Sequence, residues 1–203
     1  MQLENRIALV TGAGQGVGEG IARRLHGAGA TVVIAEYNED AGRAVADSLE
    51  RGHLITMDVS RREQVVGGVE QVIAQFGALD VLVNNAGLNV KDRHTDVLTV
   101  ADWRKVIDVD VNGVFHCIHP VLPMMRAQGG GLILNVSSWA GRWPAYLAGA
   151  AYNAAKHAVS AMNELLNMEE GEHGIRCTAI CPGEVYTPIM DARPVPPPLE
   201  EKQ

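Results

Sequence analysis

Short runs rich in Val, Ile and Leu alternate with longer stretches of helical periodicity along most of the chain. The runs are almost continuously apolar, as strands buried on both faces of a sheet should be. They lie at residues 6–11, 31–35, 53–57, 81–84, 132–136 and 176–180. The helical stretches lie at about 17–28, 39–50, 61–76, 100–127 and 152–171, and two of them open with capping boxes, Ser60 with Glu63 and Thr99 with Asp102. This alternation predicts an α/β fold, a doubly wound parallel sheet with helices on both faces.

The final residues break this pattern. The chain has 203 residues, enough for one domain with a substantial core, and we expect residues 1–190 to form it. Residues 193–203, RPVPPPLEEKQ, contain four prolines and show no apolar face. We therefore expect 191–203 to be a Pro-rich tail, either a polyproline-II linker or a disordered segment. A Pro-rich docking motif is the less favoured alternative.

Charge and cysteine content narrow the possible partners and the compartment. The net charge of −7 disfavours binding to nucleic acid or to an anionic membrane. No segment is apolar for long enough to span a bilayer, and the N-terminus lacks a secretory signal pattern. The cysteines have no disulfide-framework spacing and no nearby His to complete a metal site. We expect Cys117, Cys177 and Cys181 to be buried thiols of a cytoplasmic protein that binds no metal.

A glycine-rich sequence, TGAGQGVG at 11–18, joins the first predicted strand to the first predicted helix. Gly12, Gly14, Gly16 and Gly18 permit positive φ and leave no Cβ between the backbone and a ligand. The free N–H groups and the positive dipole end of the following helix attract anions, so this turn predicts a pyrophosphate site. No Lys-Ser/Thr pair follows, which disfavours a P-loop. The alternative is a tight turn without a ligand.

Glu36 ends the second predicted strand. A carboxylate there can accept hydrogen bonds from both hydroxyls of an adenosine ribose and would repel a 2′-phosphate. Gln15, rather than Arg or Lys, stands where that phosphate would lie. Both features favour NAD over NADP, although Arg43 leaves NADP binding open as an alternative. The alternative interpretation of Glu36 is a solvated charge in a loop.

Six short motifs occur in a fixed order, each weak alone. They are TGAGQGVG at 11–18, DV at 58–59, NNAG at 84–87, NVSS at 135–138, YNAAK at 152–156 and PGEVYTP at 182–188. Together they resemble the short-chain dehydrogenase/reductase family over essentially residues 5–190. The resemblance implies a Rossmann-like fold and a single dinucleotide-binding and catalytic domain over residues 1–190.

The same resemblance assigns the cofactor contacts. Asp58 would bind the adenine amino group beside the Val59 backbone, the 84–87 stretch would close the cofactor cleft, and residues 182–187 would lie along the nicotinamide. The implied contacts are Gly12, Gly14, Gln15, Gly16, Val17, Gly18, Glu36, Asp58, Val59, Asn85, Ala86, Gly87, Tyr152, Lys156, Pro182, Gly183, Val185 and Thr187. The implied cofactor is NAD, with NADP less favoured.

The resemblance also gives a reason for the spacing of Tyr152 and Lys156, which taken alone is equally consistent with an amphipathic helix carrying a solvated Lys. Tyr152 would be the general acid/base, and the Lys156 ammonium would stabilise its phenolate. Ser138 would hold the substrate oxygen in line. Asp110 stands where the family usually has an Asn that helps hold a relay water near the Lys, and it adds a negative charge.

The implied enzyme is an NAD(P)-dependent oxidoreductase that transfers hydride between the nicotinamide and a secondary alcohol or ketone. Its partners would be a small-molecule substrate and copies of itself, as a homodimer or homotetramer through helices 100–127 and 152–171. The alternative is a nucleotide-binding protein with little catalysis. Asp110 motivates it, as does the absence after residue 190 of the covering segment and further strand that the family usually has.

Overall fold

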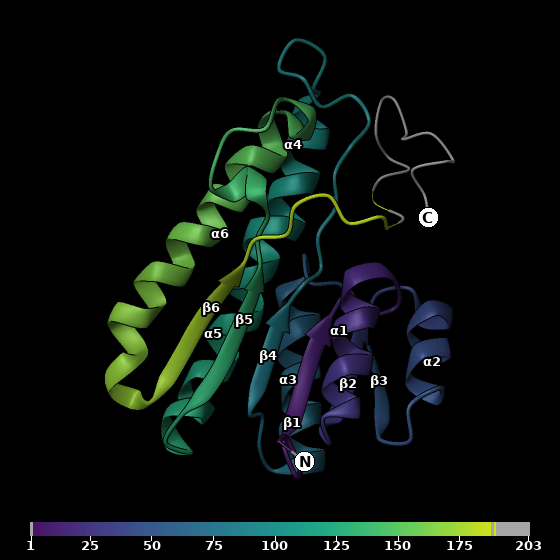
Figure 1. Ribbon diagram of the computed structural model, residues 1–203, viewed down its shortest axis with the longest axis vertical. Coiled ribbons are helices and arrows are strands. Elements are labelled where there is room, and N and C mark those ends of the chain that lie inside the picture. Colours follow the sequence, from purple (N-terminus) through teal and green to yellow (C-terminus); the bar gives the residue numbers. More distant parts are fainter. Residues whose placement is uncertain (1, 188, 190–203) are drawn as a thin grey trace.

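Six parallel strands form the sheet of the computed structural model, which describes residues 2–187 and 189 (Figure 1). The strands are β1 (Ile7–Thr11), β2 (Thr31–Glu36), β3 (Gly52–Thr56), β4 (Val81–Asn84), β5 (Gly131–Val136) and β6 (Ile175–Ile180). Their spatial order is β3-β2-β1-β4-β5-β6. Each strand lies at a predicted apolar run, so the predicted doubly wound α/β fold is confirmed. The predicted tail at 191–203 lies outside the described residues.

Helices cover both faces of this sheet. They are α1 (Gly16–Gly27), α2 (Glu39–Asp47), α3 (Arg62–Phe76), α4 (Val100–Ile107), α5 (Gly113–Ala127) and α6 (Gly149–Glu170), with short 3₁₀ turns at Trp139–Gly141, Tyr146–Ala148 and Gly171–His173. Apolar residues of α1 and α2 share one core cluster with the strands, and those of α3, α5 and α6 share the other. Within the described residues, no helix combines the length and apolar character that crossing a membrane requires.

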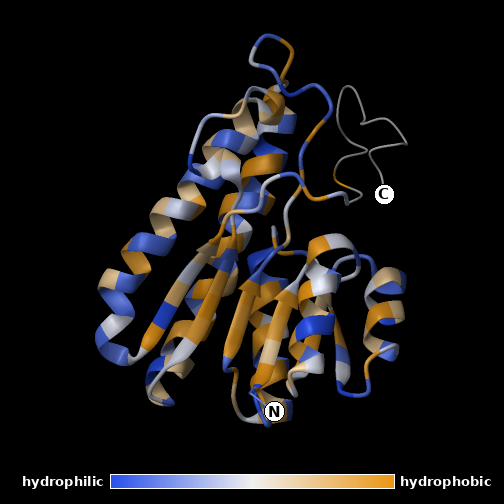
Figure 2. Ribbon diagram, viewed as in Figure 1, coloured by the Kyte–Doolittle hydropathy of each residue, from blue (hydrophilic) through white to orange (hydrophobic). Residues whose placement is uncertain are grey.

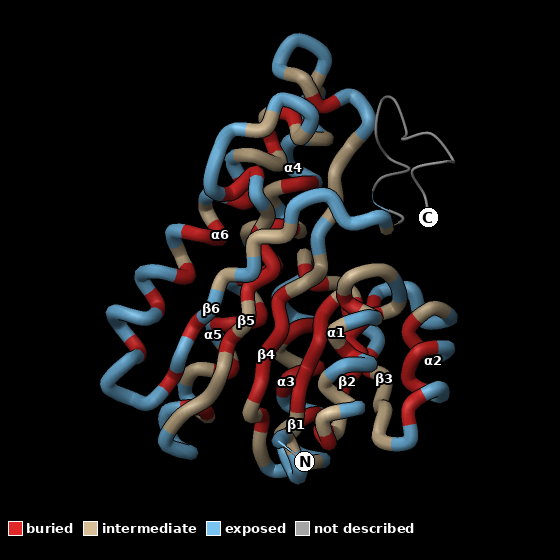
Figure 3. Tube along the Cα trace, in the orientation of Figure 1, coloured by how far each residue is buried: buried red, intermediate tan, exposed pale blue. Residues whose placement is uncertain are grey.

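Alternation of side chains along β1 supplies both clusters. Ala8 and Val10 point to the α1–α2 face and Leu9 points to the α3–α5–α6 face, and all three are fully buried. The central strands are accordingly apolar in Figure 2 and buried in Figure 3. Burying one such side chain contributes about 1.5–3 kcal/mol. Because all strands run in parallel, their carboxyl ends meet at one edge of the sheet, where ligands of such folds bind.

The predicted helix 100–127 is interrupted by a π-helical turn at Asp108–Asn112 between α4 and α5. A π turn accommodates one residue more than an α-helical turn and often marks a functional site. Here it contains Asp110, which is completely buried. The sequence analysis expected one continuous helix over 100–127 and did not predict this π turn.

The two predicted capping boxes have different outcomes. Thr99 caps α4 by accepting a hydrogen bond from the Asp102 N–H, as predicted. The prediction for Ser60 is wrong, because α3 begins after Arg61 and no side chain caps it. Instead, the Ser60 N–H and hydroxyl both donate to Asp58 Oδ1, so Ser60 orders the loop after β3.

The three cysteines are free thiols with different exposures. Cys117 and Cys177 are buried as predicted, whereas Cys181 is partly exposed, contrary to prediction. Burial raises the pKa of the Cys117 thiol to about 12. Burial, with a smaller effect of Glu170, raises the pKa of Cys177 to about 11. Both thiols therefore stay protonated and unreactive at neutral pH.

Candidate active site

A cleft of about 680 Å³ opens at the carboxyl edge of the sheet, and the segment that follows each of the six strands contributes to its wall. Most residues singled out from the sequence line it. They are Gly12, Gln15, Gly16, Val17, Glu36, Asp58, Val59, Asn85, Ala86, Gly87, Ser138, Tyr152, Lys156, Pro182, Gly183, Val185 and Thr187.

Gly14, Gly18 and Asp110 are not among the residues that line the cleft. A Cβ on Gly18 would lie 2.3 Å from the Gly12 carbonyl oxygen, so glycine at this position lets α1 pack against the turn. Gly14 donates its N–H to Glu36 Oε2 at 3.1 Å. These glycines therefore shape the turn, and their predicted contact with the cofactor stays a prediction.

The turn after β1 meets the requirements of an anion site. Gly12 has φ +62°, and a Cβ there would lie 2.8 Å from Ala86 Cα. Helix α1 begins at Gly16, and its N-cap, Gln15, makes no side-chain capping hydrogen bond. The N–H groups of the first turn thus face the cleft without a side-chain acceptor, as binding of a pyrophosphate requires.

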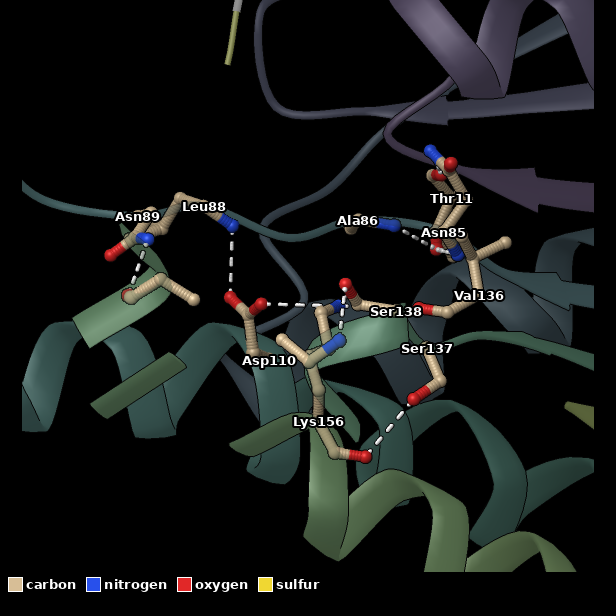
Figure 4. A network of polar contacts seen from close by, with 12 residues as sticks. Thr11, Asn85, Ala86, Leu88, Asn89, Asp110, Val136, Ser137, Ser138 and Lys156 are labelled. Carbon is tan, nitrogen blue, oxygen red and sulfur yellow. Dashed lines mark hydrogen bonds and ion pairs between the residues drawn. The ribbon is translucent and has the colours of Figure 1, made fainter. Parts of the chain in front are cut away.

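A network of hydrogen bonds joins this turn to the 84–87 stretch (Figure 4). Thr11 Oγ1 accepts hydrogen bonds from the N–H groups of Asn85 and Ala86, both at 3.0 Å. The Asn85 amide donates to the carbonyl oxygens of Thr11 at 2.9 Å and Gly12 at 3.0 Å. The two walls of the cleft are therefore held in a fixed relation before any ligand binds.

Glu36 is buried rather than solvated, with 6% of its surface exposed. Its carboxylate accepts the N–H groups of Gly14, Tyr37 and Asn38, each at 3.1 Å. These three backbone donors hold the carboxylate in one position. A fixed negative charge therefore stands at the end of β2 beside the glycine-rich turn.

Lys156 is almost completely buried, so the interpretation of it as a solvated helix lysine is wrong. Its Nζ donates to the Val136 carbonyl at 3.2 Å, lies 3.2 Å from Asp110 Oδ2, and lies 5.2 Å from the centre of the Tyr152 ring. Burial lowers the pKa of Lys156, but the charges of Asp110 and Tyr152 outweigh it and the pKa is raised overall. The group remains an ammonium ion between Asp110 and Tyr152.

Asp110 reaches Lys156 from the π turn (Figure 4). Its Oδ1 accepts the Leu88 N–H at 2.8 Å. Its Oδ2 has no well-aligned hydrogen bond, so the approach of Lys156 Nζ is an ion pair rather than a directed bond. Burial raises the pKa of Asp110, while Lys156 and the Leu88 N–H act in the opposite direction. The pair compensates two charges that burial would otherwise strongly disfavour.

Two neighbouring serines have different roles. Ser138 faces the cleft, and its Oγ accepts the Ala140 N–H at 3.1 Å. Ser137 is buried, and its Oγ contacts the Lys156 carbonyl and Ser160 Oγ, each at 3.0 Å. Ser137 thus anchors α6 to the end of β5. The sequence analysis did not single it out, although the doubled serine of NVSS was the available signal.

A second cavity, of about 340 Å³, adjoins the cleft. Ser138, Tyr152 and Asn89 line both spaces, as do Pro182, Gly183, Val185 and Ile189. The other residues of the second cavity are mainly apolar: Trp139, Ala140, Leu147 and Ala148, with Arg93 and Glu184. Trp139 therefore borders this cavity, whereas Trp143 and Tyr146, which follow in the same loop, do not line it.

Comparisons with known proteins identify the family. A profile described as short chain dehydrogenase matches residues 6–195. A 3beta-hydroxysteroid dehydrogenase of Mediterraneibacter gnavus is 37% identical over 194 residues, covering 94% of this chain and 70% of that enzyme. A cyclohexanol dehydrogenase of an Acinetobacter species is 34% identical over 197 residues, covering 93% and 76%.

Solved structures show the same fold. The 3-ketoacyl-(acyl-carrier-protein) reductase from Brucella melitensis, complexed with NADH, has a TM-score of 0.91 and 31% identity, over 95% of this chain and 80% of that one. The fold, the ordered motifs and the matched profile agree. The chain therefore belongs to the short-chain dehydrogenase family, whose members are oxidoreductases that use nicotinamide cofactors.

Proposed function

We propose that this protein transfers hydride between NAD and a secondary alcohol or ketone, with Tyr152 as the general acid/base. The observation that carries the proposal is the position of Ser138 and Tyr152 where the two cavities meet. A cofactor in the larger cleft and a substrate in the smaller, apolar cavity would both reach these side chains. A protein that only binds nucleotide has no need of such a junction.

The bound nicotinamide would supply the hydride acceptor for oxidation and the donor for reduction. In oxidation, Tyr152 accepts the hydroxyl proton of the alcohol while the hydrogen on the carbinol carbon leaves as hydride. In reduction, Tyr152 returns that proton to the carbonyl oxygen. Ser138 Oγ donates a hydrogen bond to the substrate oxygen and orients it. Lys156 places a buried positive charge beside the phenol. Asp110 holds this Lys in place from behind.

Replacing Tyr152 tests the acid/base assignment. Tyr152→Phe should lower turnover of a cyclic secondary alcohol by about 10²–10⁴-fold, because the proton acceptor is lost. Affinity for NAD should be retained. Formation of reduced nicotinamide is followed by absorbance, with cyclohexanol and a 3β-hydroxysteroid as first substrates because relatives carry those names. Tyr146→Phe is the control, since Tyr146 is 81% exposed and lines neither cavity. Activity retained in Tyr152→Phe contradicts the assignment.

Glu36 supports a preference for NAD over NADP. A 2′-phosphate at the end of β2 would meet a buried carboxylate whose charge three N–H groups fix in place. Glu36→Ala should therefore narrow the difference between the NAD and NADP dissociation constants measured by calorimetry. Glu70→Ala is the control, because Glu70 is exposed on α3 and lines neither cavity. Tighter binding of NADP by the unmodified protein would contradict this preference.

We propose that the protein forms a homo-oligomer through α4, α5 and α6. Large apolar side chains are exposed on these helices: Trp103, Phe115, Leu165 and Met168. Light scattering during gel filtration measures the mass directly. Charged replacements at Phe115 and Met168 should reduce it; a monomer at micromolar concentration would contradict the proposal.

A further inference from the structure

We infer that Asn89 and Arg93 are positioning residues that hold the start of α6, and with it Tyr152, against the substrate cavity. This inference rests on the proposed function, because it concerns the placement of the proposed general acid/base. Both side chains come from the polar segment after β4, far from Tyr152 in the sequence. Neither residue is a cysteine, a histidine or a carboxylate, the side-chain types from which candidate catalytic groups are usually chosen.

The evidence lies in residues 145–149, the segment that leads into α6. Arg93 Nη1 donates to the Leu147 carbonyl at 3.3 Å, and Asn89 Nδ2 donates to the Ala148 carbonyl at 3.0 Å. Figure 4 shows the second of these contacts. From the other side, Asn153 donates to the Ala145 carbonyl at 2.8 Å and to the Gly149 carbonyl at 2.6 Å. Three side chains thus hold four carbonyls of one five-residue segment.

The backbone of Arg93 also holds the start of α6 in place. Its carbonyl accepts the Ala150 N–H at 3.0 Å. Gly149 has φ +74°, and a Cβ there would lie 2.4 Å from the Arg93 carbonyl oxygen. Helix α6 has no side-chain N-cap of its own. Contacts with Arg93 and Asn89 therefore replace local capping in fixing where α6 begins, only three residues before Tyr152.

Asn89 and Arg93 are also fixed by contacts within their own segment. Arg93 is 4% exposed, and its Nε donates to the Val90 carbonyl at 2.7 Å. Asn89 Oδ1 accepts the Val90 N–H at 2.8 Å. Asn89, Arg93, Leu147 and Ala148 all line the smaller cavity. The contacts that place Tyr152 therefore also form the wall against which the substrate would rest.

The test compares Arg93→Met and Asn89→Ala with the unmodified enzyme. Displacing a reacting group by about 1 Å can cost about 10²-fold in rate, so we expect kcat for a secondary alcohol to fall 10- to 100-fold. In Arg93→Met, affinity for NAD should change little, because Arg93 lines only the smaller cavity and the glycine-rich turn and Glu36 are untouched. The isotope effect from a deuterated carbinol carbon should rise, because poorer orientation slows the chemical step. Arg93→Lys, which keeps one donor, should recover part of the loss.

Arg126→Met is the matched control. Arg126 anchors the opposite end of α6 through Glu170, with Nε 2.7 Å from Oε2, and it lines neither cavity. Its loss should lower the melting temperature without lowering kcat. An equal loss of kcat in Arg126→Met and Arg93→Met would show only general destabilisation and would overturn the inference.

Hydrogen–deuterium exchange gives a readout that does not depend on activity. In Arg93→Met and Asn89→Ala, amides of residues 145–152 should exchange faster while those of β1 and β4 keep their rates. Unchanged exchange at 145–152 would overturn the inference whatever the kinetics show. Absence of turnover by the unmodified enzyme on every alcohol and ketone would instead count against the proposed function, and faster exchange in the variants would still support the positioning role.

Discussion

Replacing Lys156 with Met should destabilise the folded protein, because Asp110 loses the charge that compensates its burial. The substitution keeps a long side chain but removes the cation 3.2 Å from the fully buried Asp110. The pKa of Asp110, which burial already raises, should rise further because its opposing charge is gone. Asp110 would then be either an uncompensated buried anion or a neutral acid.

Removing one partner of a buried ion pair typically costs about 3–5 kcal/mol. For a protein of this size, each kcal/mol lowers Tm by roughly 2–4 °C, so Lys156→Met should melt roughly 6–20 °C below the unmodified protein at neutral pH. The folded pKa of Asp110 in the variant exceeds its unfolded value. Its protonated form is therefore compatible with folding below the unfolded pKa of about 4, and stability is lost as the pH rises through the folded pKa.

Urea unfolding followed by circular dichroism at several pH values measures this difference. The free-energy gap between the unmodified protein and Lys156→Met should be small at acidic pH and widen toward neutral pH. The double variant Asp110→Asn/Lys156→Met carries neither charge, so it should recover most of the stability and lose the pH-dependent gap. The reasoning fails if Lys156→Met matches the unmodified protein at neutral pH, or if the double variant is no more stable than Lys156→Met.

Two further substitutions test the cleft wall and the fold. Gly18→Ala should abolish NAD binding in a fluorescence titration, because its Cβ would lie 2.3 Å from the Gly12 oxygen and 2.4 Å from Asn85 Nδ2. Gly20→Ala is the control, because a Cβ at Gly20 in the same helix would meet open space, and this variant should bind NAD normally. Tight NAD binding by Gly18→Ala would contradict this. Thr99→Ala removes the cap of α4 and should lower the free energy of unfolding by about 1 kcal/mol without changing NAD affinity; an unchanged unfolding midpoint would show that the cap is dispensable.

The positions of the strands could be predicted because burial on both faces leaves a continuous apolar run in the sequence. The carboxyl ends of parallel strands meet at one edge, where the cleft lies. Asp58, Asn85 and Ser138 were placed in the site by the resemblance to the short-chain dehydrogenase/reductase family, and they line one cleft.

Contacts that depend on side-chain direction could not be predicted in this way. The resemblance placed Asp110 near Lys156, but neither the π turn that carries Asp110 nor its complete burial was predicted. Arg93 lies in the polar sequence KDRHTD, which is typical of a solvated loop, yet it is buried. Its partner carbonyl, that of Leu147, is 54 positions away. Glu36 was placed at the correct strand end, but its three backbone donors depend on the exact path of two turns.

The π turn at Asp108–Asn112 also determines which changes of length this helix can absorb. Such a turn holds one residue more than an α-helix needs, so a single deletion within it can restore a regular helix. Val106 before the turn and Val114 after it would then keep their buried faces. Asp110, however, would rotate by about 100° for each position it shifts, away from Lys156 and Leu88. A chain shortened here should keep its core and lose its site, whereas most deletions in core helices lose both.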